Sequence, residues 1–108
     1  MEKDLIFYES SAGKIPFRKW LSKVSDLRAQ AKIQVRLDRL IKGHYGDCSA
    51  LRNGVSELRI DYGPGYRVYF GEQKNRLVIV LLLGGTKKKQ NKDIELAIQY
   101  WEDYKRNY

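Results

Sequence analysis

The spacing of apolar residues in the first half of the chain predicts one strand followed by two helices. Residues 4–9 (DLIFYE) combine β-branched and aromatic side chains and favour a short strand. Pro16 suits the first turn of a helix, and Asp26 suits the cap of a second helix that Gly43 ends. Apolar residues recur at helical spacing in both segments. They are Phe17, Trp20, Leu21 and Val24 in the first helix, and Ala29, Ile33, Leu37, Leu40 and Ile41 in the second.

The apolar period changes to two at residue 55, which indicates strands. Leu58 and Ile60 point to one side of the expected sheet, and the charged residues between and around them point to the other. Residues 62–65 (YGPG) predict a tight turn, because their two glycines can adopt positive φ and the proline stops the pairing. The alternation resumes in residues 66–70, so the two segments are expected to form a hairpin.

A third strand and a last helix complete the pattern. Residues 76–83 are almost all apolar, so this strand is expected inside the sheet, and Gly84 with Gly85 is expected to end it. Asn91 or Asp93 can cap the final helix. The predicted fold class is α+β, in the order β-α-α-β-β-β-α, with a mostly antiparallel sheet packed against helices. The apolar stripe of the final helix is Ile94, Ala97, Ile98 and Trp101.

The length and composition fit one domain over residues 1–108. Hydrophobic residues make up 43% of the chain, which is enough for a core. There is one cysteine, Cys48, and no Cys/His cluster with metal-ligand spacing, so we expect no disulfide, metal or other cofactor. The apolar run at residues 77–83 is too short to span a bilayer, and the sequence shows no cleavable leader. We therefore expect a cytoplasmic protein without a membrane partner.

The charge of the chain favours an anionic partner. Its net charge is +8, from 21 Lys and Arg against 13 Asp and Glu. Nucleic acid is the commonest partner of such a protein, and an anionic membrane face or an acidic protein are the competitors. The sequence lacks an RNP-type aromatic pair, a GXXG loop and a Walker pattern, which argues against the standard RNA-recognition modules and nucleotide hydrolases.

Cations concentrate in the hairpin and in the turn that follows the third strand. Arg59 and Arg67 lie on the polar side of the hairpin, and Lys87, Lys88 and Lys89 follow the third strand. Arginine suits phosphate binding because its planar fork can hold two oxygens while staying charged. These five residues therefore predict a surface that binds a polyanion.

Structural roles are open for the same residues. Arg59 and Arg67 can instead form ion pairs with Glu57 and Asp61 across the hairpin. Tyr69, on the polar side with Arg67, can stack on a base or donate a proton, and it can equally pack beneath the final helix. The three lysines can be a solvated turn.

A second basic surface is predicted on the second helix. Four cations fall there at i, i+4, i+8 and i+11, and therefore form one ridge. The ridge is either a contact for RNA or a partner, or a solvated face. Its members are Arg28, Lys32, Arg36 and Arg39.

The motifs of the second half resemble those of a known family. They are the hairpin ELRIDYGPGYRVYF, the apolar strand, and the lysine-rich turn KKKQ followed by a helix. In this order and spacing they resemble the RelE/HigB superfamily of toxins from type II toxin-antitoxin systems, and specifically its phage-derived, HigB-like addiction-module branch. The resemblance covers nearly the whole chain and implies a single RelE-like domain.

The resemblance implies an endoribonuclease, or mRNA interferase, that inhibits translation. Such a protein enters the ribosomal A site and cuts the exposed mRNA codon. The 2′-hydroxyl of the RNA acts as the nucleophile, which leaves a cyclic or 3′-phosphate end and requires no cofactor. A helix-turn-helix antitoxin is the implied protein partner.

The resemblance also assigns roles to individual residues. Arg67 corresponds to the arginine of the GYR motif, which contacts the scissile phosphate in relatives, and Arg59 corresponds to the cation of the preceding strand. Lys87 or Lys88 corresponds to the basic residue after the apolar strand, and Gln90 to the polar residue that closes the turn. These four cations are the catalytic candidates. The RNA-binding candidates are Lys89, Gln90, Tyr69, Arg28, Lys32, Arg36 and Arg39.

Two positions depart from the pattern of RelE proper. Glu57 stands where RelE carries a lysine, and Asp93 stands where it carries a tyrosine. Glu57, Tyr69 or His44 can substitute in proton transfer, although Glu57 beside Arg59 is better interpreted as an ion pair. His44 has no partner in sight and lies in the polar loop that is predicted over residues 43–54. A lysine among other cations can also share in proton transfer, because its charged form is disfavoured there.

Two functions without catalysis are the alternatives. One is a basic sheet that holds RNA or the ribosome and does not cut. The other is an interaction domain whose basic grooves bind an acidic segment of the antitoxin. A DNA-binding pair of helices does not explain the cations of the sheet.

Overall fold

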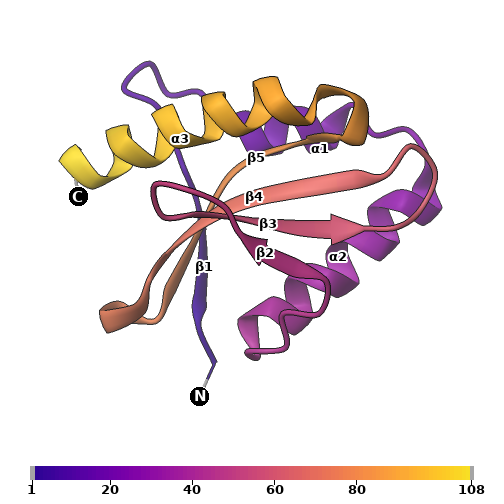
Figure 1. The fold of residues 1–108 in the computed structure, drawn as a ribbon, viewed down its shortest axis with the longest axis horizontal. Helices are drawn as coiled ribbons and strands as arrows, with labels where there is room; N and C mark the ends of the chain where they lie inside the picture. Colours follow the sequence, from indigo (N-terminus) through magenta and orange to yellow (C-terminus); the bar gives the residue numbers. More distant parts are fainter. Residues whose placement is uncertain (1, 108) are drawn as a thin grey trace.

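Five strands form one mixed sheet in the order β1-β5-β4-β3-β2 (Figure 1). In this computed structural model, which describes residues 2–107, β1 pairs with β5 in parallel and the other neighbours pair antiparallel. The fold class is α+β, as predicted. The strands are β1 (Asp4–Phe7), β2 (Cys48–Ala50), β3 (Val55–Ile60), β4 (Tyr66–Gln73) and β5 (Val78–Thr86).

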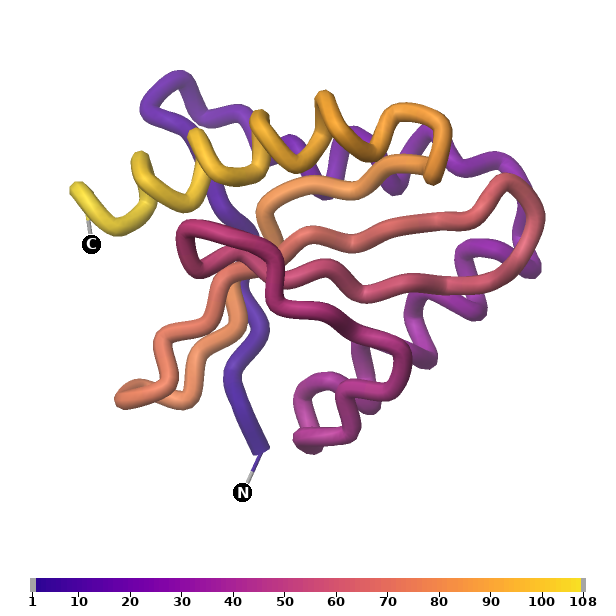
Figure 2. The backbone as a smooth tube through the Cα atoms, viewed as in Figure 1, coloured from indigo at the N-terminus to yellow at the C-terminus, as the bar shows by residue number. Residues whose placement is uncertain are grey.

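Helices cover both faces of the sheet, and the backbone tube in Figure 2 shows how they enclose it. Side chains of α1 and α2 pack against Leu58 and Val68, whereas side chains of α3 pack against Tyr69 on the other face. Each face of the sheet therefore has its own hydrophobic core. The helices are α1 (Pro16–Ser22), α2 (Leu27–Ile41) and α3 (Gln90–Asn107), and two 3-10 turns are η1 (Lys74–Arg76) and η2 (Lys87–Lys89). Within residues 2–107, no helix has the length and apolar character needed to cross a membrane.

The ends of the first two helices follow the capping signals of the sequence. Pro16 is the first residue of α1, where its missing N–H leaves no hydrogen bond unmade. Asp26 caps α2, because its Oδ1 accepts hydrogen bonds from the backbone N–H groups of Arg28 at 2.9 Å and Ala29 at 3.3 Å. Gly43 follows α2 with a φ of +87°, a conformation that favours glycine. All three predicted signals are confirmed.

The predicted apolar stripes of the longer helices are largely confirmed. In α2 the stripe is buried except at Ile41, which is half-buried, and in α3 it is buried except at Ile94, which is half-buried. Burial of such stripes against a sheet provides most of the stability of helices this short. The buried members are Ala29, Ile33, Leu37 and Leu40 in α2, and Ala97, Ile98 and Trp101 in α3.

One strand lies where a polar loop is predicted. Residues 43–54 contain β2, which pairs antiparallel with β3 and places Ser49 opposite Glu57. Because β2 has only 3 residues and lies at the edge of the sheet, it carries no apolar alternation that the sequence could reveal. The expectation of an unbroken loop is therefore wrong at residues 48–50.

Two glycines let tryptophans lie against the sheet from opposite faces. A Cβ added to Gly71 would lie 2.4 Å from Cε3 of Trp101, and one added to Gly84 would lie 2.0 Å from Cε3 of Trp20. No side chain fits at such distances. The expectation that Gly84 and its neighbour end the third strand is wrong, because β5 continues through both to Thr86. Glycine here makes room for a packed neighbour instead of breaking the strand.

Candidate phosphate-binding site

The centre of the candidate site is a buried carboxylate on β3. The residue Glu57 is 1% exposed. Its Oε2 accepts a hydrogen bond from Nη1 of Arg59 at 3.0 Å, and its Oε1 accepts one from Nε2 of Gln90 at 2.6 Å. The Nε of Arg67 lies 3.7 Å from the same Oε1. A buried charge needs such partners, so Glu57 gathers three predicted site residues around itself.

Strand register explains why these side chains meet. In the antiparallel pair of β3 and β4, Arg59 stands opposite Arg67 and Glu57 stands opposite Tyr69. Side chains at alternate positions of one strand share a face, and those directly opposite lie close together. The alternation in the sequence therefore correctly predicts that the two arginines share one face of the sheet. It does not reveal that Glu57, on the same face, is buried beside them.

A second carboxylate fixes Arg59. Both Nε and Nη2 of Arg59 donate to Oδ1 of Asp47, at 3.0 and 2.7 Å. Hydrogen bonds to Asp47 and Glu57 raise the pKa of the Arg59 guanidinium, and Arg59 in turn lowers the pKa of Asp47. The predicted ion pair with Glu57 is confirmed. The predicted pair with Asp61 is wrong, because Asp61 follows the end of β3 and Asp47, just before β2, takes that place.

Arg67 differs from Arg59 in having donors that no described residue uses. The residue is 9% exposed, and the buried Nε has no hydrogen-bond partner within residues 2–107. The guanidinium runs beside the turn before β4, since a Cβ on Gly65 would lie 3.9 Å from Nη1 of Arg67. The Nε is closed off from solvent beside the Glu57 carboxylate, so an anion would reach Arg67 through the terminal nitrogens of its planar fork, of which Nη1 borders the turn at Gly65. Arg67 is therefore a preformed cation for a bound anion.

Tyr69 is buried and does not offer a face to a nucleic-acid base. The residue has no exposed surface, packs with Trp101 and Tyr104 of α3, and its hydroxyl has no hydrogen-bond partner among the described residues. Burial, and next the charge of Glu57, raise the pKa of Tyr69, so its phenol stays protonated. The packing interpretation is confirmed. The expectation that Tyr69 lies on an open polar face, ready to stack on RNA, is wrong.

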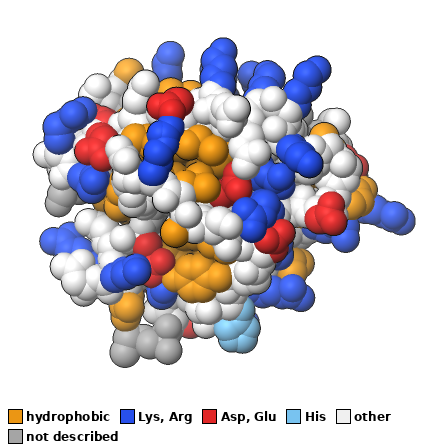
Figure 3. Space-filling view, in the orientation of Figure 1, with side chains coloured by type: hydrophobic (Ala, Val, Ile, Leu, Met, Phe, Trp, Pro, Cys, Tyr) orange, Lys and Arg blue, Asp and Glu red, His pale blue; other side chains and the backbone are white. Residues whose placement is uncertain are grey.

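The predicted lysine turn lies directly beside the arginines. Lys87, Lys88 and Lys89 form η2 and are all exposed. The backbone N–H of Lys87 donates to the carbonyl of Gly65 at 2.8 Å, which joins η2 to the turn next to Arg67. Figure 3 shows Lys and Arg side chains flanking acidic ones on this face of the molecule.

Gln90, at the start of α3, has a structural role in the same cluster. Its side-chain amide donates to Glu57, so that donor is not free for RNA. The hydrogen bond also ties the first residue of α3 to β3 and so fixes the direction in which η2 presents its lysines. We therefore place Gln90 among the residues that position the site.

The basic ridge of α2 does not join this cluster, because α2 covers the opposite face of the sheet. Arg36 is committed to structure: it donates to the backbone carbonyls of Arg59 at 2.6 Å, Tyr45 at 3.2 Å and Asp47 at 3.3 Å. Lys32 lies 5.2 Å over the ring of Tyr62. The remaining members are exposed, and they are Arg28 and Arg39.

One residue of the site, Asp47, has no strong sequence signal. Asp47 comes from the polar loop, where no pattern marks it as a partner of Arg59. His44, three residues earlier, is exposed and makes no side-chain hydrogen bond or ion pair among residues 2–107, in line with the non-catalytic interpretation. No cluster of three or more His, Cys, Asp or Glu within that range is arranged to hold a metal ion.

Comparison with other proteins gives a relative but no described family. No protein-family model matches the chain. A Haemophilus influenzae protein, described only as uncharacterized, is 49% identical over 83 residues, which cover 77% of this chain and 83% of that protein. An identity this high over most of both chains shows common descent. The chain therefore belongs to the same family as this Haemophilus influenzae protein.

Proposed function

We propose that the chain is a RelE/HigB-type toxin that cuts mRNA in the ribosomal A site through the 2′-hydroxyl of the RNA. The proposal includes a RelE-like fold, to which β2 is an addition, and a cytoplasmic location. The resemblance of the hairpin and lysine turn supports it, and so does the order of the other elements, which agrees with the order expected from the sequence.

The observation that carries the proposal is the state of Arg67. Cleavage by a 2′-oxygen creates a phosphorane with extra negative charge, and a preorganised cation lowers the barrier to it. Arg67 is held in place by burial and by Glu57, yet its Nε has no acceptor within the described residues. Since the guanidinium is already oriented and partly desolvated, binding a phosphate at its terminal nitrogens requires little reorganisation.

The other residues of the cluster then have separate roles. Glu57 positions Arg67, and Arg59 is a second cation whose charge adds to the field at the phosphate although three of its donors already have partners. Lys87 and Lys88 are the groups proposed for proton transfer: one, as the neutral amine, accepts the proton of the attacking 2′-hydroxyl, and the other, as the ammonium, protonates the leaving 5′-oxygen. The lysines of η2, including Lys89, also bind flanking phosphates.

The proposed partners are mRNA on the ribosome and a helix-turn-helix antitoxin. The exposed cations of η2 and the free members of the α2 ridge, Arg28 and Arg39, supply two separate basic surfaces, one after the end of β5 and one on α2. A toxin must contact both the ribosome and its antitoxin. We assign the η2 surface to RNA and leave the ridge as the secondary contact.

A non-catalytic RNA-binding or antitoxin-binding module is the second candidate, and one observation favours it. Both oxygens of Glu57 accept hydrogen bonds, and the phenol of Tyr69 is buried. Neither is therefore free to take the proton from a 2′-hydroxyl. In this module Arg67 would hold an RNA phosphate without cleavage.

Inducing the chain alone in bacterial cells distinguishes the two candidates. If the chain is a nuclease, growth stops and primer extension detects cuts inside translated messages. Growth arrest with intact messages would support the binding module instead. A neighbouring gene for a short helix-turn-helix protein that reverses the arrest would establish the antitoxin.

Replacing Lys87, Lys88 and Lys89 by alanine is expected to weaken ribosome association and to reduce its salt dependence. The plot of log affinity against log salt falls with a steepness of about 0.7 for each phosphate contact to a single strand. Losing the contacts of all three lysines should therefore reduce the steepness by about two. The matched control removes the same charge elsewhere, through alanine at Lys74, Arg76 and Arg106. An unchanged slope in the η2 variant would make the lysines a solvated turn.

A further inference from the structure

The outer side of α2 carries a row of apolar residues that neither hydrophobic core uses. Leu27, Ala31 and Val35 follow one another at intervals of four residues, so they lie in one row along the helix. All three are exposed, Leu27 to 77% and Val35 to 46%. Scattered apolar residues are normal on a protein surface, but a continuous exposed row is typical of an interaction surface.

A row of cations runs beside the apolar row. It consists of Arg28, Lys32 and Arg36, and Arg39 continues the apolar row itself at its C-terminal end. Arg36 already donates to three backbone carbonyls. The other three cations form no ion pair within residues 2–107, so their charge is available to a partner.

A groove of about 410 Å³ separates α2 from the end of β3. Ala31 and Val35 contribute apolar surface to it, and Ile60 of β3 lines it too. Among the described residues Asp61 is the one carboxylate of its lining, against three cations, which are Lys32, Arg36 and Arg39. The groove therefore combines apolar surface with an excess of positive charge.

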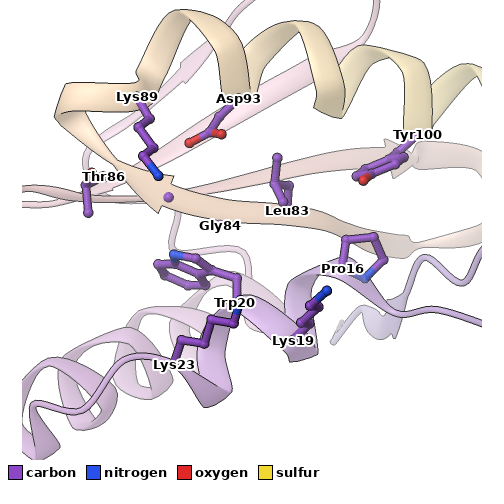
Figure 4. Close-up of a pocket in the computed structure, with 11 residues that line it drawn as sticks. Pro16, Lys19, Trp20, Lys23, Leu83, Gly84, Thr86, Lys89, Asp93 and Tyr100 are labelled. Carbon is purple, nitrogen blue, oxygen red and sulfur yellow. The ribbon is translucent and has the colours of Figure 1, made fainter.

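The cavity along β5 in Figure 4 has a similar volume, about 390 Å³, but the fold already uses its walls. The indole of Trp20 packs on Gly84, and the carboxylate of Asp93 lies on Gly85. Because successive residues of a strand face opposite ways, these two side chains lie on opposite faces of β5. The groove beside α2 differs, since the side chains of the apolar row remain exposed to solvent.

We propose that the outer side of α2 binds an acidic amphipathic helix of a partner protein. The apolar stripe of that helix would pack on the apolar row, as ridges of one helix pack into grooves of another. Its carboxylates belong on the side of Arg28 and Lys32, because Asp38, which accepts a hydrogen bond from Gln34 at 3.0 Å, borders the other side of the row. The contact does not depend on RNA cleavage, since Arg67 takes no part in it.

Other occupants use only part of this surface. RNA would contact the cations and leave the apolar row in water, because bases stack on aromatic rings and the row has none. A second copy of the chain, with its net charge of +8, would bring like charges together. An acidic helix with an apolar stripe matches both the charge and the apolar surface.

An NMR titration of the isotope-labelled protein with three probes tests the inference. The first probe is a synthetic peptide of about 18 residues, long enough to be helical, with leucines in one row and glutamates beside them. The second has the same composition in an order that breaks the row, and the third is a single-stranded RNA oligonucleotide. The first peptide should shift the amides of residues 27–39 and bind at least about tenfold more tightly than the second, because only it buries an apolar row.

Three results would overturn the inference. Equal binding of the two peptides would show that charge alone acts. Unchanged amides on α2 would show that this surface binds no such helix. RNA that shifts the amides of residues 27–39 more strongly than the amphipathic peptide would assign the surface to nucleic acid.

Removal of the apolar row is the sharper test. Leu27→Ala together with Val35→Ala should weaken binding of the first peptide by about tenfold, because the lost methyl and methylene groups are buried in the contact. Both side chains are exposed in the free protein, so the melting temperature should not change. Ile6→Ala, which removes an exposed apolar side chain from β1, is the control and should bind like the wild type. Wild-type affinity of the double variant would overturn the inference.

Removal of the cations tests the other half of the surface. Arg28→Gln with Lys32→Gln should weaken binding of the first peptide and reduce its salt dependence. Lys74→Gln with Arg76→Gln, which removes the same charge from η1, should do neither, and equal effects of the two pairs would overturn the inference. Peptide binding by a chain that cuts no RNA would contradict the nuclease and support this contact, and cutting without peptide binding would do the reverse.

Discussion

Arg67→Ala is expected to lower the rate of RNA cleavage by at least about 100-fold, which corresponds to about 3 kcal/mol of transition-state stabilisation. The reason is that Arg67 is a buried cation that Glu57 holds in place and whose Nη1 borders the turn at Gly65. Arg59 cannot replace it, because Asp47 and Glu57 already hold its guanidinium. The measurement is the single-turnover rate of cleavage of ribosome-bound mRNA by the purified protein.

Two further variants separate loss of chemistry from loss of charge or fold. Arg67→Lys keeps the charge but not the planar fork, so its rate should fall between those of the wild type and the alanine variant. Arg76→Ala removes the same charge from the exposed turn η1, at the far end of β4, and should cut normally. Cleavage by Arg67→Ala at the wild-type rate, in a protein with an unchanged melting temperature, would remove Arg67 from the mechanism.

Gly71→Ala is expected to destabilise the fold by about 2 kcal/mol, because overpacking a rigid core typically costs about 1–3 kcal/mol. The added methyl would meet Cε3, Cδ2 and Cζ3 of Trp101 at 2.4 to 2.5 Å. These are atoms of a buried ring that cannot swing aside. For a domain near 100 residues this change lowers the melting temperature by about 10 °C, which thermal unfolding followed by circular dichroism measures.

The Trp101→Phe background provides the control for this prediction. Phenylalanine has one ring and lacks the indole atoms Cε3 and Cζ3, which make two of the close contacts. The cost of Gly71→Ala should therefore be much smaller in this background. The two substitutions should thus be strongly non-additive in a double-mutant cycle. Equal costs in both backgrounds would show that the contact with Trp101 is not the reason for glycine at this position.

Much of the fold is predictable from local patterns. Asp26 and Pro16 mark helix starts whose chemistry is local, because the cap needs only neighbouring N–H groups. The alternation of Leu58 and Ile60 reports which side of the hairpin is buried against α2. For the same reason the sequence correctly placed Arg59 and Arg67 on one face of the sheet.

The rest depends on contacts between distant parts of the chain. Burial of Glu57 and Tyr69 follows from the path of α3, which the alternation within β3 and β4 cannot reveal. The pairing of Asp47 with Arg59 requires the short edge strand β2 to bring the two together. Gly84 gives a misleading local signal, because glycine marks either a turn or a close approach and only the position of Trp20 decides between them.

The site thus consists of a rigid part and an open part. Glu57, Arg59 and Gln90 form a network whose partners are fixed within the protein. Arg67 and the lysines of η2 border it with donors that remain free for an anion within the described structure. Such a division suits a site that must bind a flexible strand at a fixed point, since the fixed groups orient the cation and the free ones contact the substrate.

The central claim is that the Arg67 site cleaves RNA through the 2′-hydroxyl. Mapping of transcript ends after induction of the chain in cells, with analysis of the end groups, tests it most directly. The account predicts cuts inside translated messages, with a 2′,3′-cyclic or 3′-phosphate on the upstream fragment and a 5′-hydroxyl on the downstream one. Intact messages in arrested cells, or cuts that leave 5′-phosphates, would contradict it.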